Sequence, residues 1–167
     1  MFLVQKRIIP RTTETMSDLV SIVRGPVNYN SALECTRDVE TGAIACFIGT
    51  TRNSFESRSV VHLEYDVYTQ MALTVMRRLC ATLRSSWPGI KHISISHASG
   101  IVSAGEASVV IAISSVHRKD ALQAVDFAIE HIKAELPVWK KEVYGDSDSE
   151  WKSNALDQMH SQTHSEN

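Results

Sequence analysis

This sequence of 167 residues lacks paired cysteines, long apolar runs and an excess of positive charge. Its three cysteines, Cys35, Cys46 and Cys80, are far apart and include no CxxC pair. This spacing argues against a zinc ribbon, a redox dithiol and a disulfide scaffold, and it favours a reducing compartment such as the cytosol. We expect Cys46 and Cys80 to pack in the core and not to act as nucleophiles.

The charge balance and the short apolar runs disfavour two classes of partner. Lys and Arg number 17 against 19 Asp and Glu, so no positive field surrounds the whole molecule to attract nucleic acid or an anionic membrane. The basic, apolar start at 1–13 is interrupted by Pro10 and is too short for a signal-peptide core or a membrane span. We expect any anion site to be local.

Length and composition predict one folded domain. An apolar content of 43% is ample for a core between two layers of secondary structure. The acidic C-terminal segment offers little that could form a core. We expect a flexible extension at 1–18, one domain at 19–154 and a flexible polar tail at 155–167.

Six apolar or β-branched runs have the length and pattern of strands. They lie at 19–24, 42–51, 60–67, 90–97, 107–115 and 138–144. The polar segment 52–58 between the second and third runs is typical of an exposed loop. We therefore expect 42–51 and 60–67 to form a long antiparallel pair around that loop.

Two segments carry apolar residues at the three-to-four spacing of a helix, and we expect a further short helix from Ser31. Pro88-Gly89 ends the first long segment and Pro137 ends the second. The expected buried stripes are Met71, Ala72, Val75, Met76, Leu79, Cys80 and Leu83, then Ala121, Leu122, Val125, Ala128, Ile129, Ile132 and Leu136. Strands returning as hairpins with two main helices favour an α+β fold with a mostly antiparallel sheet.

The junction SSVHRKD at 114–120 is the clearest candidate for a binding site. A buried strand gives way there to a helix, whose N-terminus offers unpaired N–H groups and a positive dipole end. With Ser115 as a plausible cap and His117 and Arg118 beside it, the junction suits a phosphate. A capped helix start with solvated charges is the more common meaning of such a motif.

Lys133 lies in the last turn of the second long helix, and Lys140 follows seven residues later across a turn bounded by Pro137. If the next strand folds back beside the helix, the two ammonium groups approach one pocket and can take part in proton transfer. The period of a strand places Lys140 and Glu142 on one face and Lys141 on the other. Solvated lysines are the alternative.

Arg52 opens the polar loop, where a guanidinium can bind a phosphate through two hydrogen bonds. Thr50 and Thr51 precede it and can add contacts, although both are also ordinary strand residues. His92 and His97 are five residues apart in a predicted strand and point to opposite faces. We therefore expect no metal site, and nothing in the sequence indicates a cofactor.

Five motifs follow one another in the sequence: FIGTTRN at 47–53, LEYDVY at 63–68, SSVHR at 114–118, HIKAELPVWKKE at 131–142 and GDSDSEWKSN at 145–154. Each is weak alone. Together, in order and at matching spacing, they are similar to the large subunit of molybdopterin synthase, the MoaE family. The resemblance implies an α+β fold with a hammerhead-like element.

The resemblance also implies an enzyme, a sulfurtransferase of molybdenum cofactor biosynthesis. Sulfur would pass from the C-terminal thiocarboxylate of a small ubiquitin-like subunit, the MoaD-like partner, to cyclic pyranopterin monophosphate, forming the molybdopterin dithiolene. Two large subunits would form a central homodimer within a heterotetramer. Because sulfur comes from the partner, this subunit needs cations and a shaped pocket instead of its own nucleophile.

Matched motif by motif, the resemblance implies catalytic roles for Lys133 and Lys140. The implied substrate-binding residues are Thr50, Thr51, Arg52, His117, Arg118, Lys133, Lys140, Lys141 and Glu142. Our hypothesis is that Arg52, His117 and Arg118 bind the substrate phosphate while the two lysines stabilise charge and move protons. Bacterial members often have Lys-Val where this chain has Thr50-Thr51, so a cationic contribution at Thr50 is missing.

Two other functions are compatible with the same residues. One is a noncatalytic module that binds a phosphorylated ligand or an RNA end through Arg52, His117 and Arg118. The aromatic residues fall mostly in predicted core segments, which disfavours base stacking. The other is a scaffold whose lysines only dock an acidic partner. Sulfur transfer from a partner distinguishes all three.

Overall fold

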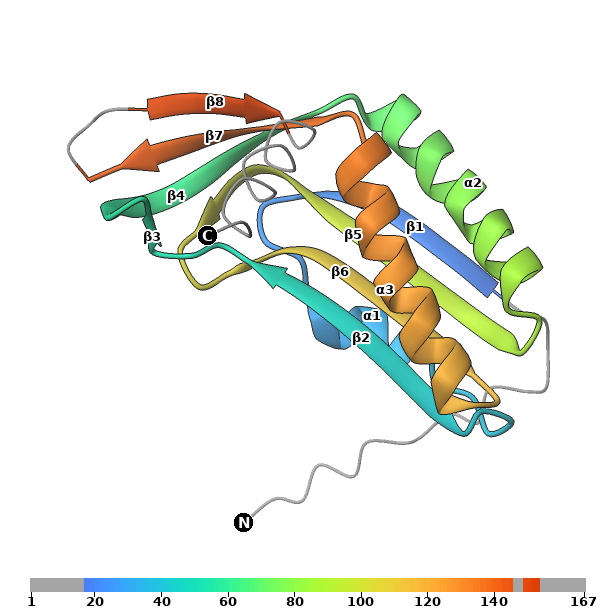
Figure 1. The fold of residues 1–167 in the computed structure, drawn as a ribbon. Helices are drawn as coiled ribbons and strands as arrows, with labels where there is room; N and C mark the ends of the chain where they lie inside the picture. Colours follow the sequence, from blue (N-terminus) through green and yellow to red (C-terminus); the bar gives the residue numbers. More distant parts are fainter. Residues whose placement is uncertain (1–16, 146–148, 154–167) are drawn as a thin grey trace, which may run out of the picture.

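The computed structural model describes residues 17–145 and 149–153. Within these ranges the chain forms eight strands and three helices (Figure 1). In order they are β1 (Ser17–Arg24), α1 (Tyr29–Cys35), β2 (Ala43–Thr50), β3 (Ser54–Phe55), β4 (Arg58–Val67), α2 (Thr69–Ser86), β5 (Ile90–Ser103), β6 (Ala107–Ser115), α3 (Arg118–Glu135), β7 (Val138–Tyr144) and β8 (Ser149–Ser153). The predicted α+β fold is confirmed.

The long strand β5 belongs to two parts of the sheet. Residues 90–97 pair antiparallel with β6, which pairs with β2, and 92–99 pair parallel with β1. Beyond that, 100–103 pair with β4, and the sheet continues through β7 to β8. Gly100 lies at this change of partner with a φ of +74°, a conformation that favours glycine. All these pairings except β1 with β5 are antiparallel.

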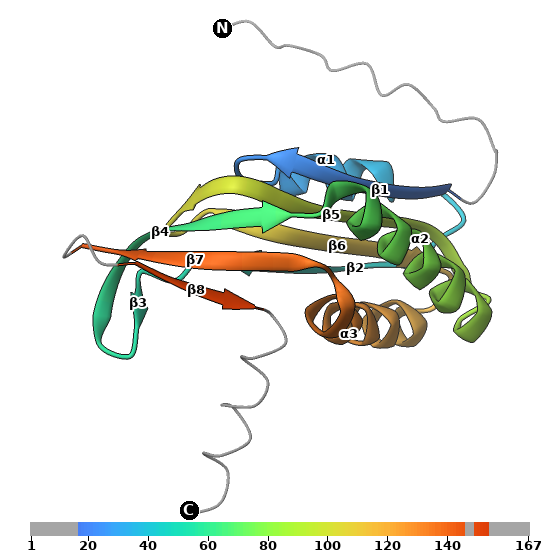
Figure 2. The same ribbon diagram turned by 90° about the horizontal axis from the view of Figure 1, so that it is seen from above.

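The helices cover the first part of the sheet from both sides. Helices α2 and α3 lie against one face, while the short α1 lies against the other (Figure 2). Alanines at 121, 124 and 128 are buried on α3 and let that helix approach the sheet closely. The most deeply buried side chains include Ile93, Ile95, Ile111 and Ile113 from β5 and β6. The core therefore lies between this sheet face and the two long helices.

Most of the two predicted helical stripes is buried, but each contains one error. Met71 is 56% exposed and Leu122 is 62% exposed. Both lie in the first two turns of their helices, at the margin of the stripe, where the sheet does not cover them. Ala124, which the predicted stripe omitted, is buried instead.

The predicted pairing of 42–51 with 60–67 is wrong. Strand β2 pairs with β6, and β4 pairs with β5 and β7. The segment predicted as an open loop contains β3, which forms its own hairpin with β4. Glu56 and Ser57 at its tip both have positive φ, the conformation of a tight two-residue hairpin turn. This local hairpin redirects the chain away from β2.

The ends of the domain and one cysteine also differ from expectation. Strand β1 begins at Ser17, and β8 was not predicted; the other residues of the expected extension, and the expected tail at 155–167, lie outside the described residues. Cys80 is buried as expected, and burial raises the pKa of its thiol to about 12. Cys46 is exposed, because β2 turns it away from the face that α3 covers.

Gly42 provides a test of the close approach between β2 and the β6–α3 junction. A Cβ at this position would lie 2.5 Å from the carbonyl oxygen of Val116, so the backbone would have to move. We predict that Gly42→Ala lowers the free energy of unfolding by about 1–3 kcal/mol, measured by chemical denaturation. Gly145→Ala is the control, because its Cβ would meet only Ser59 Cβ at 4.0 Å. Equal stability of both variants would contradict this account.

Candidate functional site

A cavity of about 210 Å³ lies where the end of β2, the strands β4 and β7, and the last turns of α3 meet. We call it the α3–β7 cavity. Its polar lining includes Thr50, Arg52, His97, Lys133, Lys140 and Glu142. Residues far apart in the sequence therefore meet in a space small enough for one ligand group to contact several of them.

The connection between α3 and β7 brings the two lysines to this cavity. Helix α3 ends at Glu135, and β7 begins at Val138, after a two-residue connection that contains Pro137. Lys133 lies in the last turn of the helix, half exposed, and its Nζ is 3.5 Å from a Glu130 carboxylate oxygen. Lys140 lies on the face of β7 that lines the cavity. Both ammonium groups can therefore reach a ligand from different elements.

Glu142 supplies a buried carboxylate two residues after Lys140 on the same face of β7. Its side chain is only 4% exposed, and the Tyr144 hydroxyl donates a hydrogen bond of 2.6 Å to its Oε2. The Arg58 guanidinium lies over the Tyr144 ring, 3.7 Å from the ring centroid. This chain of contacts fixes the carboxylate at the wall of a cavity otherwise rich in positive charge.

His97 lines the same cavity, and the sequence did not assign it to the site. The side chain is buried on β5, where its Nδ1 donates to the Ala98 carbonyl at 2.8 Å. Tyr65 packs edge-on against the ring, with centroids 5.2 Å apart. Burial lowers the pKa of His97 below its ordinary value of 6.5. Strand alternation puts His97 on the same face of β5 as Ile93 and Ile95. The tertiary fold brings His97 to the cavity that β7 also lines.

Two residues named from the sequence lie elsewhere. Lys141 points to the outer face of β7, where its Nζ is 3.7 Å from Glu64 and 5.8 Å from the centroid of the Trp151 ring. Thr51 is buried, and its backbone bonds with Glu106 and Gly105. Neither lines the α3–β7 cavity. For Lys141 the reason is the alternation of β7, which sends neighbouring side chains in opposite directions.

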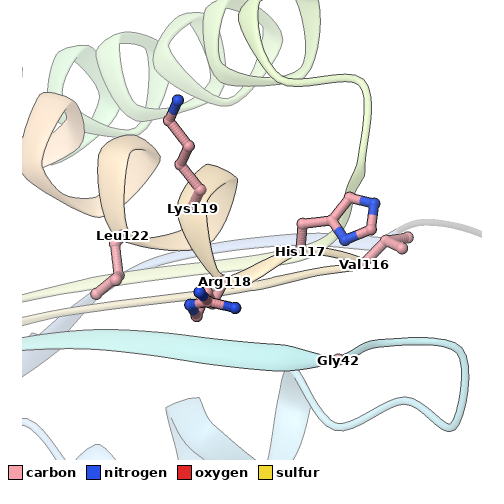
Figure 3. Close-up of a pocket in the computed structure, with 6 residues that line it drawn as sticks. All are labelled: Gly42, Val116, His117, Arg118, Lys119 and Leu122. Carbon is pink, nitrogen blue, oxygen red and sulfur yellow. The ribbon is translucent and has the colours of Figure 1, made fainter.

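His117 and Arg118 lie at the other end of α3. They line a hollow of about 540 Å³ together with Gly42, Val116, Lys119 and Leu122. Arg118 and Leu122 point toward β2, whereas Lys119 points the opposite way (Figure 3). The expected cap at Ser115 is wrong: the N-cap residue is His117, and the Ser115 hydroxyl donates to the Gly89 carbonyl at 2.9 Å.

The length of α3 separates the two groups of cations within one chain. Arg118 and Lys133 are fifteen residues apart on the helix, which corresponds to about 22 Å along its axis. A single small ligand does not span that distance. Within one chain, therefore, Arg52 lines the α3–β7 cavity, whereas His117 and Arg118 line the separate hollow at the start of α3.

Comparison with known proteins places these features in a family. The family model described as MoaE protein matches residues 22–135. A molybdopterin synthase catalytic subunit from Taeniopygia guttata is 52% identical over 137 residues, which cover 82% of this chain and 88% of that protein. The chain belongs to the MoaE family. The interpretation of the sequence as a molybdopterin synthase catalytic subunit, an enzyme, is confirmed.

Other MoaE relatives agree in sequence and fold. Molybdopterin synthase catalytic subunit 1 of Aedes aegypti is 56% identical over 115 residues, covering 68% of this chain and 74% of that protein. The crystal structure of molybdopterin synthase from Staphylococcus aureus matches with a TM-score of 0.74 and 36% identity, covering 78% of this chain and 94% of that one. The Drosophila melanogaster relative is 47% identical over 138 residues, covering 82% of this chain but 38% of that protein.

Membrane-spanning helices and metal-ligand clusters are both absent among the described residues. No helix there is long and apolar enough to cross a membrane. No cluster of three or more His, Cys, Asp or Glu side chains that could hold a metal ion occurs among them.

Burial of His97 predicts a pH dependence of stability. The unfolded chain gains a proton at this residue as the pH falls below about 6.5, whereas the folded protein resists protonation because its pKa is lowered. Stability is therefore lost as the pH falls through that range. We predict that lowering the pH from about 7.5 to 5.5 destabilises the wild type more than His97→Gln, measured by denaturant unfolding. The same pH-dependent loss in both proteins would contradict this assignment.

Proposed function

We propose that this chain transfers sulfur from the thiocarboxylate end of a small ubiquitin-like partner to cyclic pyranopterin monophosphate, and that the α3–β7 cavity receives the end of the partner's tail. The observation that supports this most is the meeting of Lys133, Lys140 and Glu142 in one cavity. The Staphylococcus aureus structure and the curated relatives carry the name of the same synthase.

The size and charge of the cavity suit a peptide end. A volume of about 210 Å³ is below the roughly 300–1,000 Å³ of most small-molecule sites. A narrow chain ending in an anionic thiocarboxylate fits this space better than a whole pterin does. The two ammonium groups attract the negative end, and Arg52 at the exposed rim can bind a phosphate on the second substrate.

In the proposed chemistry, Lys133 and Lys140 act in two ways. The partner's sulfur attacks a carbon of the pterin and breaks a carbon–oxygen bond there, so that oxygen leaves as part of the opened phosphate or, with protons, as water. Water then hydrolyses the resulting thioester, so sulfur stays on the pterin and the tail leaves as a carboxylate. Negative charge develops on the tail's carbonyl oxygen during hydrolysis, and Lys133 and Lys140 are placed to stabilise it. A lysine ammonium can also supply the proton that the released sulfur accepts. The step is performed twice to complete the dithiolene.

Single alanine substitutions test the two lysines. We predict that Lys133→Ala and Lys140→Ala each lower molybdopterin formation about 100-fold or more with purified thiocarboxylated partner, because a charge-stabilising donor is lost. Lys141→Ala is the matched control on the same strand, since Lys141 points to the outer face. It should keep most of the turnover. Near-normal turnover in both Lys133 and Lys140 variants would reject the proposal.

We further propose that two copies of the chain form a homodimer, which carries one small partner at each end as a heterotetramer in the cytosol. Strand β2 supports this arrangement: it pairs on one side with β6 and has no second partner strand among the described residues. Ile44, Cys46 and Ile48 are exposed along it. An exposed edge strand with apolar side chains is suited to pairing with a second copy.

Antiparallel pairing of two β2 strands would also reunite the separated cations. The hollow with His117 and Arg118 lies at the start of β2, and Arg52 lies beyond its end. A two-fold axis near the middle of β2 would bring the hollow of one copy next to the cavity of the other. The eight residues of β2 span about 27 Å, close to the offset of about 22 Å between Arg118 and Lys133. Each site would then draw residues from both copies.

Mixing inactive subunits tests the shared site. We predict that Arg118→Ala and Lys133→Ala homodimers are both inactive but that a statistical mixture regains roughly a quarter of wild-type turnover, because one site in each mixed dimer is intact. The mixture must be assayed after unfolding and refolding the two variants together. No recovery would reject the sharing of sites between copies.

Cys46 offers a check on the pairing itself. It lies near the middle of β2, so two Cys46 thiols should lie close to the proposed axis. A short bifunctional maleimide should link two copies of the wild type, and Cys46→Ser should abolish the link. Efficient linkage through another cysteine instead would argue against β2 as the interface.

A further inference from the structure

His97 is buried, yet one edge of its ring faces the α3–β7 cavity. The side chain is 4% exposed and forms part of the cavity lining. Its Nδ1 is occupied by the Ala98 carbonyl, so that nitrogen carries the proton and Nε2 has the free lone pair. No other hydrogen bond of the ring occurs among the described residues. Nε2 is therefore an acceptor that the protein itself leaves for a ligand.

The charged groups at the cavity are mostly donors. Lys133, Lys140 and Arg52 can only donate. The Glu142 carboxylate is an acceptor, but the Tyr144 hydroxyl already occupies one of its oxygens. A ligand that presents both an anionic end and an N–H group needs an acceptor near these cations. A peptide end has this character, since each of its backbone N–H groups must find a partner once it leaves water.

We infer that His97 is a further binding residue of the site, whose Nε2 accepts a hydrogen bond from a backbone N–H near the end of the partner's tail. This inference rests on the proposed function and adds a residue to it. The hydrogen bond would fix the depth and direction of the tail, so that its terminal sulfur lies beside Lys133 and Lys140. His97 is thus assigned to tail binding and not to proton transfer.

The role requires a neutral ring. Several groups face the ring or the cavity: Tyr65 on β4, Arg52 after β2, Lys133 on α3, and Lys140 and Glu142 on β7. Burial lowers the pKa of His97, so the ring of the folded protein stays neutral at neutral pH. Protonation at low pH would turn the Nε2 acceptor into a donor facing another donor. Tail affinity should therefore stay constant through neutral pH and fall only below the lowered pKa of His97.

Two variants separate the acceptor from the shape of the ring. His97→Phe keeps an aromatic ring but removes the acceptor, whereas the carbonyl oxygen of His97→Gln can occupy the position of Nε2. We expect His97→Phe to weaken binding of the carboxylate form of the small partner about 10- to 100-fold, and His97→Gln to stay within about threefold. Calorimetry with the full chain gives these affinities. In turnover, His97→Phe should raise the KM for the partner by a larger factor than it lowers kcat.

A shortened partner is the matched control. Without its last two residues the partner cannot present the N–H to His97, so wild type and His97→Phe should bind it equally. If His97→Phe binds the full-length tail as tightly as the wild type does, the inference is wrong even where Lys133→Ala is inactive. Absence of sulfur transfer by the wild type would instead overturn the proposed function.

If His97→Phe does not fold, the pH dependence of tail affinity in His97→Gln tests the inference. The wild type should keep its tail affinity down to about pH 6.5 and lose it only as the pH falls below the lowered pKa of His97, and His97→Gln should lose clearly less. The small partner without its last two residues corrects for titration of other groups in either protein. The same tail-specific loss in both proteins would show that His97 does not accept this hydrogen bond.

Discussion

The abrupt reversal of the chain between α3 and β7 is the constraint on which the site depends. Pro137 cannot continue the helix, and Leu136 is already extended at the helix end. The Pro137 carbonyl accepts a hydrogen bond of 3.3 Å from the Tyr68 backbone N–H, which ties this reversal to the start of α2. Because β7 then pairs with β4 in a fixed register, Lys140 and Glu142 have one possible orientation. The helix contributes Lys133 to the same space.

A second constraint is the division of β5 between two parts of the sheet. The first part carries the core and both long helices, whereas the second carries β4, β7 and β8. The cavity lies where these parts meet, so most of its walls come from the sheet and from α3, and Arg52 is added by the segment after β2. His97 lies three residues before Gly100, where β5 changes partner, which explains how a core residue comes to line a cavity.

The distribution of charge along α3 gives the molecule two separate positive ends. Arg118 lies at the start of the helix and Lys133 in its last turn. The helix dipole favours a cationic side chain such as Lys133 near the C-terminus of the helix. It disfavours cations at the N-terminus, so their presence at that end is consistent with a role in binding an anion. In the proposed dimer each end would meet the opposite end of the second copy. The short α1 leaves Ile44, Cys46 and Ile48 of β2 exposed for that contact.

Local patterns in the sequence determined the elements and the direction of several side chains. Periodicity gave α2, α3 and most strands, and alternation alone placed Lys140 and Glu142 opposite Lys141. Other features depend on the tertiary structure and cannot be predicted from local patterns. Contacts between distant segments determine the pairing of β2 with β6, the exposure of Cys46 and the approach of His97 to β7. A pattern along the chain fixes the face of a residue, but only packing decides what that face meets.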